Sequence, residues 1–229
     1  MKLTLEHAFP KWLRNVMPEA WEVGPHVRED ALGNVTNWRA VAFSDTVRRT
    51  CGPCNNGWMH DLEVRAQPIL TPLIHGEAAS LDPIRVQIVA FWLAKTFMML
   101  SCAHKGVIIP AAHFHELYAS RRAPRQSLIA IGCADVWRQE ILDFHYPLRL
   151  NGPFDLGATE TNAYAISIRV GKFIAHMLGH RIPNARLYPE VSLPDTMTEI
   201  WPETRPVAWP PAVTISDADA DVVVRMFPQ

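Results

Sequence analysis

Cysteine, net charge and long apolar runs are all scarce in this sequence. The four cysteines stand at positions 51, 54, 102 and 133, too few and too scattered for a disulfide scaffold. Basic and acidic residues nearly cancel, with 22 of the former and 23 of the latter. This balance argues against a nucleic-acid enzyme, which usually carries excess positive charge. It leaves room for a local basic patch such as Lys11, Arg14, Arg48 and Arg49.

Targeting and membrane signals are also missing. The start, Met-Lys-Leu-Thr-Leu-Glu-His, has no apolar core of the length that a signal peptide needs. The longest apolar run, residues 88–103, contains Lys95 and is shorter than the ~20 residues that a bilayer requires. We therefore expect a soluble, cytoplasmic protein with no membrane contact.

What the chain does have is enough apolar sequence for a real core, since 48% of its 229 residues are hydrophobic. The patterns predict the α+β class, with a small N-terminal module at residues 1–78 packed on a larger α+β body at residues 79–229. The body is expected to surround a buried central helix at residues 84–104, because apolar residues occur there on nearly every helix face. Its C-terminal segment is rich in proline, which favours extended structure over a long helix.

Shorter elements follow from periodicity, turn residues and proline positions. A β-prone start precedes a helix at residues 10–17, and Pro68 is expected to end a helix that begins near Trp58. The further expected helices are residues 69–75 and 110–122, and the expected strands are residues 38–43 and 45–49 around a turn, Ser127–Cys133 and Ala163–Val170.

Cys51-Gly-Pro-Cys54 has the turn spacing of half a zinc knuckle, in which two thiolates hold one metal. A tetrahedral zinc site needs two more ligands, and the sequence has no second Cys-x-x-Cys. Other cysteines and histidines lack the supporting spacing, namely Cys102, Cys133, His60 and His75. A reduced thiol pair in a turn is the simpler interpretation.

The same four residues also match a thiol redox site of the thioredoxin type. That chemistry needs the first thiolate at the start of a continuous helix, where its pKa is lowered. Asn55-Asn56-Gly57 follows directly and disfavours a helix, so redox chemistry is a minor alternative.

Glu6 and His7 pair a carboxylate with an imidazole. A neutral imidazole accepts a proton from water, and a neighbouring carboxylate binds a hard cation. Adjacent residues on a strand point in opposite directions, so both serve one site only if the chain bends, as Pro10 favours. An exposed surface pair is the plain alternative. His113 and His115 lie in a predicted helix and are expected at the surface.

Two blocks of sequence resemble the HNH (ββα-metal) endonuclease-like proteins of bacteria and their phages. They are Glu6-His7-Ala-Phe-Pro-Lys-Trp-Leu13 and Cys51-x-x-Cys54-Asn-Asn-Gly-Trp-Met-x-Asp-Leu-Glu63. A weaker similarity continues through Phe91-Trp92-Leu-Ala-Lys-Thr96, Ile200-Trp201-Pro202 and Trp209-Pro210-Pro211.

The resemblance implies a hairpin and a helix that hold one Mg²⁺ or Mn²⁺ ion over a DNA phosphodiester bond. His7 would be the general base, Glu6 the acidic metal ligand, and Asn55 the amide ligand in the last position of the motif, with Asn56 as its substitute. Cys51 and Cys54 would be half of a structural Zn²⁺ knuckle.

The sequence departs from the family pattern in two places. The Cys-x-x-Cys that usually precedes the Glu-His element has no counterpart, so either the true start lies upstream or the zinc is lost. Thr46 stands where a central Asn is expected. Two other functions therefore stay open: a catalytically degenerate relative that binds nucleic acid or protein, and a thiol redox protein using Cys51 and Cys54.

Overall fold

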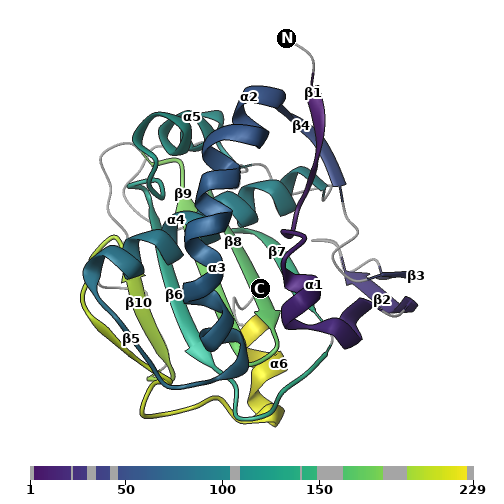
Figure 1. The fold of residues 1–229 in the computed structure, drawn as a ribbon, viewed down its shortest axis with the longest axis vertical. Coiled ribbons are helices and arrows are strands. Elements are labelled where there is room, and N and C mark those ends of the chain that lie inside the picture. Colours follow the sequence, from purple (N-terminus) through teal and green to yellow (C-terminus); the bar gives the residue numbers. More distant parts are fainter. Residues whose placement is uncertain are drawn as a thin grey trace.

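The computed structural model describes residues 3–21, 23–29, 35–41, 46–103, 109–139, 141–148, 162–182 and 195–225. Helices and sheets both occur, which confirms the predicted α+β class. The largest sheet has five antiparallel strands in the order β10-β6-β9-β8-β7 (Figure 1). These strands are Ser127–Cys133 (β6), Leu142–Leu148 (β7), Ala163–Val170 (β8), Phe173–His180 (β9) and Met197–Trp201 (β10).

Both faces of this sheet are covered. Every residue of β6, β8 and β9 is buried, which explains why these strands read as apolar runs rather than as alternating patterns. Alternate residues of β6 join different apolar clusters. Ile129 and Ile131 belong to the cluster that contains residues of helices α3 (His60–His75) and α4 (Pro83–Ala103). Leu128 and Ala130 belong to the cluster that contains residues of helix α6 (Asp217–Arg225).

Helix α4, Pro83–Ala103, is the predicted central helix, and every residue from Val89 to Ser101 is buried. Its start is stabilised by Asp82, whose carboxylate accepts the backbone N–H of Arg85 at 2.8 Å. By length and composition α4 would be able to cross a membrane, and 78% of its apolar stretch is buried inside the protein. Its environment is that of a core helix.

Helix α3, His60–His75, corrects the prediction that Pro68 ends a helix. The helix continues through Pro68 and Pro72 into a left-handed cap at Gly76. Pro68 lies on the exposed side, one turn after the exposed Val64, so the carbonyl that loses its N–H partner faces water. The opposite side packs against α4, and this burial outweighs the local preference.

The N-terminal part contains two small antiparallel strand pairs. β1, Leu3–His7, pairs with β4, Thr46–Cys51, and β2, Val23–Glu29, pairs with β3, Val35–Val41. The strands predicted at residues 38–43 and 45–49 therefore exist approximately, but they do not pair with each other. The helix predicted at residues 10–17 is reduced to a turn at Pro10 followed by α1, Leu13–Val16, and a 3-10 turn, Pro18–Trp21.

At the C-terminal end, β11, Val207–Trp209, pairs with β5, Ala79–Leu81. Extended structure was expected throughout this segment, but helix α6, Asp217–Arg225, follows the last closely spaced prolines. Ser216 caps it, since its hydroxyl accepts the backbone N–H of Asp219 at 3.2 Å. Residues 183–194 lie outside the described parts of the chain.

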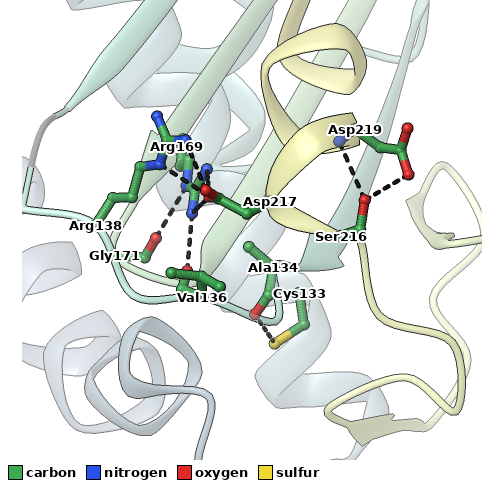
Figure 2. A network of polar contacts seen from close by, with 9 residues as sticks. All are labelled: Cys133, Ala134, Val136, Arg138, Arg169, Gly171, Ser216, Asp217 and Asp219. Carbon is green, nitrogen blue, oxygen red and sulfur yellow. Dashed lines mark hydrogen bonds and ion pairs between the residues drawn. The ribbon is translucent and has the colours of Figure 1, made fainter.

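Asp217, in the first turn of α6, links this helix to the sheet (Figure 2). Its carboxylate accepts two hydrogen bonds from Arg138, at 2.8 and 2.7 Å, and lies 3.5 Å from the fully buried Arg169 of β8. Arg169 also donates to the carbonyls of Val136 and Gly171. The two guanidinium groups hold the pKa of Asp217 below its usual value.

A single apolar cluster reaches from Ala8 to Trp209 and includes residues of both α3 and α4. It therefore contains residues from each side of the predicted boundary near residue 78. The division into two domains stays a prediction.

Candidate functional site

The β1–β4 pair is followed directly by a helix. The ladder joins Leu3 to Cys51 and His7 to Thr46, with an extra residue in β4 between the partners of Thr4 and Glu6. Leu3 and Leu5 are about half exposed, at 46% and 55%. Because side chains alternate along a strand, Thr4 and Glu6 point the other way, toward the helix that begins after Cys51.

Asn55 fixes the start of this helix to β1. Its Nδ2 donates to the backbone carbonyl of Leu5 at 3.2 Å and lies 3.4 Å from the hydroxyl of Thr4. Thr4 in turn donates to the carbonyl of Thr50 at 3.2 Å. With the amide nitrogen directed at β1, the amide oxygen is the atom that remains to accept a donor or a cation.

Glu6 lies beside Asn55 and is partly buried. Burial raises its pKa, and the nearby carboxylate of Glu63 adds to this rise, whereas Lys95 and the Asn55 side chain oppose it. The structure thus brings together two of the predicted site residues, Glu6 and Asn55. It also places a buried lysine next to them.

His7 ends β1 and is half-buried. Burial lowers its pKa, and the positive charges of Lys11 and Arg14 lower it further, so the imidazole is neutral at pH 7. His7 follows Glu6 in the same ladder, so by the same alternation its side chain leaves β1 on the opposite face. Among the hydrogen bonds of the described residues, none joins His7 to Glu6 or Asn55. Asn56, the predicted substitute, is exposed.

The strongest polar contacts near the site surround Glu63, which the sequence analysis did not single out. Lys95 forms an ion pair with one of its carboxylate oxygens. The other oxygen accepts the indole N–H groups of Trp12 and Trp92, each at 2.8 Å. Lys95 is fully buried and the Glu63 side chain is 15% exposed. We call these four residues the Glu63 cluster.

The Glu63 cluster gathers residues from three of the sequence blocks that carry the resemblance. Trp12 comes from the first block, Glu63 from the second, and Trp92 and Lys95 from the weaker third. The signal that would have revealed it is Lys95, a charge in the centre of an apolar run, because a buried lysine needs an anionic partner.

The Cys51–Cys54 pair occupies the first helical turn. The two sulfur atoms lie 2.9 Å apart, and the backbone N–H of Cys54 donates to the Cys51 sulfur at 3.3 Å. Hydrogen bonding from Cys54 lowers the pKa of Cys51, and the same interaction raises the pKa of Cys54. Both thiols are free.

The expected helix break after this pair is only a kink. A three-residue helix, α2 (Gly52–Cys54), and a π-helical turn, η2 (Asn55–Met59), lead into α3, and Gly57 alone has non-helical torsion angles. The predicted interruption at Asn55-Asn56-Gly57 is therefore present, as a kink at Gly57 where two helical segments meet.

The predicted ligands of the catalytic ion, Glu6 and Asn55, and those of the structural Zn²⁺ ion, Cys51 and Cys54, are both incomplete sets among the described residues. Glu6 and Asn55 offer a carboxylate and an amide oxygen, the hard donors that Mg²⁺ takes together with water and phosphate. In the described parts of the chain, no group of three or more His, Cys, Asp or Glu side chains is placed to hold a metal. Cys51 and Cys54 thus lack, within these parts, the further ligands that a closed zinc site requires.

His113 was expected at the surface and is instead buried. Its Nδ1 lies 2.7 Å from the hydroxyl of Tyr164, and burial lowers its pKa. His115, two residues later on helix α5 (Ala111–Ser120), is exposed as predicted. The α5 surface that contacts the sheet accounts for the difference, because residues two apart on a helix do not share a face.

Comparisons with known proteins add no family assignment to this geometry. No protein-family model matches the chain, and neither a curated protein nor a solved structure matches it.

Proposed function

We propose that the protein is a metal-dependent phosphodiester hydrolase of the HNH type that acts on DNA. The observation that carries the proposal is the bond from Asn55 to the Leu5 carbonyl, which holds the first helical turn against β1 beside Glu6. A strand pair followed by a helix that carries an amide ligand is the arrangement that the sequence resemblance implies.

In this proposal His7 accepts a proton from the attacking water, for which its lowered pKa is suitable because the imidazole is neutral at pH 7. Glu6 and Asn55 supply the oxygen ligands for Mg²⁺ or Mn²⁺. A bound divalent ion would neutralise charge on the phosphate. Lys11 and Arg14, both exposed and close to His7, would attract the DNA backbone.

Plasmid nicking in the presence of Mg²⁺ or Mn²⁺ tests the proposal. The wild-type chain is expected to convert supercoiled plasmid to the open circle, and His7→Ala is expected to lose at least ~100-fold of that rate, as removal of a general base does. His115→Ala is the matched control, since His115 is an exposed histidine on α5, and should cut like wild type. Equal nicking by His7→Ala and wild type would reject the assignment.

A second function, DNA binding without cleavage, is favoured by one observation. The positive charge of Lys95 lies close enough to Glu6 to affect its pKa, so the carboxylate already has a cationic neighbour. A cation in that position competes with a metal ion for the same oxygens.

Binding without cleavage makes a separate prediction. Fluorescence anisotropy with duplex DNA would show affinity that falls steeply with salt, because Lys11 and Arg14 displace counterions from phosphates. Neither Mg²⁺ nor Mn²⁺ would then produce nicking. Cleavage that depends on His7 would exclude this second function.

A further inference from the structure

We propose that Cys51 and Cys54 form a reversible dithiol–disulfide site that exchanges with small anionic disulfides. The family resemblance implies a zinc knuckle here, and the described residues do not supply one. The inference starts from that disagreement and does not depend on the proposed hydrolase activity.

The geometry of the pair needs little change to form a disulfide. The sulfur atoms are 2.9 Å apart, and a disulfide bond is about 2.0 Å long. Both residues belong to one helical turn, in which Cys51 is the N-cap and Cys54 the last residue of α2. Cys51 is also the last residue of β4, so closing the bond requires a shift where β4 ends and α2 begins.

The other two cysteines are not placed for this chemistry. Cys102 lies in α4 and Cys133 is buried at the end of β6, and burial raises the pKa of each thiol. Neither is bonded to another cysteine. They serve as internal controls, because the same chain contains one close pair and two isolated thiols.

The surroundings of the pair favour an anionic reactant. Trp58, one turn after Cys54, stacks on Phe91 with ring centroids 5.5 Å apart. The guanidinium of Arg121 lies over the Trp58 ring, 4.5 Å from its centroid, and the positive charge of Arg121 acts on Cys54. A positive charge beside Cys54 attracts a carboxylate-bearing disulfide.

The exchange balances in two steps. The Cys51 thiolate attacks one sulfur of the small disulfide, and the other half leaves as a thiolate. The Cys54 thiolate then attacks the Cys51 sulfur, so that the mixed disulfide breaks and the second small thiolate leaves. The protein loses two electrons and two protons, and the small disulfide gains them as two thiols.

Alkylation in glutathione buffers tests the site. The full reduced chain is equilibrated with mixtures of reduced and oxidised glutathione, trapped with iodoacetamide in denaturant so that the buried thiols also react, and weighed by mass spectrometry. We expect four alkylated cysteines in reducing mixtures and two, Cys102 and Cys133, in oxidising ones, with the loss of two hydrogens in the Cys51–Cys54 peptide. Returning the sample to the reducing mixture should restore four.

Two variants and one metal measurement make the result decisive. Cys54→Ser should stop at a mixed disulfide on Cys51, and Cys51→Ser should form no internal disulfide. Four alkylated cysteines in fully oxidised glutathione would overturn the proposal, as would one zinc ion per purified chain that protects both thiols from iodoacetamide. Each outcome is independent of plasmid nicking, so failure here and failure of the proposed function are distinguishable.

Discussion

Two charge clusters, one buried and one partly exposed, lie on opposite faces of the main sheet. In the Glu63 cluster, one carboxylate forms an ion pair with Lys95 and accepts two indole N–H groups. On the other face of the sheet, the Asp217 carboxylate accepts hydrogen bonds from Arg138 and Arg169 (Figure 2). The first cluster is almost closed to water, whereas the Asp217 side chain is 36% exposed.

The difference shows what a buried charge does and does not indicate. The Asp217 cluster attaches helix α6 to the sheet, and no predicted site residue is near it in sequence. The Glu63 cluster also joins elements, α1, α3 and α4, but two of its charges act on Glu6. An ion pair in the protein therefore indicates, by itself, only that elements pack together. The Glu63 cluster is related to the proposed site because it lies close enough to Glu6 to affect the pKa of that residue.

The largest expected effect is a difference between the two clusters in the free energy of unfolding that each contributes. Lys95→Met leaves the Glu63 carboxylate buried without its cation, which costs about 3 to 5 kcal/mol in the free energy of unfolding. Arg169→Met should cost less, roughly 2 kcal/mol, because Asp217 keeps Arg138 and contacts water. Urea denaturation measures both.

A rescue variant sharpens this comparison. Adding Glu63→Gln to Lys95→Met removes the uncompensated charge and should recover a large part of the lost stability. Equal losses for Lys95→Met and Arg169→Met would show that the two clusters are energetically alike. No recovery in the double variant would show that the unpaired Glu63 charge does not cause the loss.

The next effect is a pH dependence of stability that comes from His176, on the same face of the sheet as Arg169. His176 lies there, with Ser167 2.6 Å from its Nδ1, and burial lowers its pKa from 6.5 to about 4. Between these values the unfolded chain binds a proton that the native chain does not, so stability falls as the pH decreases. The loss should reach about 3 kcal/mol near pH 4.

The pH dependence of urea denaturation, from pH 7.5 to 4, measures this contribution. His176→Asn, which keeps a polar partner for Ser167 and does not titrate, should flatten the curve. His115→Ala changes an exposed histidine and should leave the curve as it is in wild type. A curve that His176→Asn does not alter would contradict the assignment.

A smaller effect concerns the two indole hydrogen bonds of the Glu63 cluster, which should contribute unequally to the free energy of unfolding. Trp12→Phe removes one N–H donor from the carboxylate while Lys95 and Trp92 remain, at a cost of about 1 to 2 kcal/mol. Trp92→Phe should cost more because Trp92 is buried and Trp12 is only partly so. The opposite order in urea denaturation would contradict the assignment of the larger loss to the more buried indole.

Local patterns in the sequence predicted those elements whose structure is determined mainly by their own residues. The central helix and strands β6 and β8 were predicted closely because their apolar runs have one stable solution. Pro68 was misleading, since the packing of α3 on α4 outweighs the proline. Helix α6 was missed because prolines dominate the segment before it.

Contacts between distant residues were beyond such reasoning. Pairing of β1 with β4 joins positions more than 38 residues apart in sequence across another strand pair, and no local pattern encodes that. The bond from Asn55 to Leu5 and the ion pair of Lys95 with Glu63 likewise depend on the tertiary fold. Glu6 and His7 stand out in the sequence as a carboxylate beside an imidazole, whereas the role of Asn55 is implied by the resemblance of the motif blocks to a family.

Manganese binding tests the central claim, that Glu6 and Asn55 form one metal site, most directly. Electron paramagnetic resonance of free Mn²⁺ should show one ion bound per chain, with affinity lowered about tenfold or more by Glu6→Gln and by Asn55→Ala. Glu77→Gln, at an exposed carboxylate outside the site, should bind like wild type. No bound ion, or equal affinity in Glu6→Gln and wild type, would contradict the account.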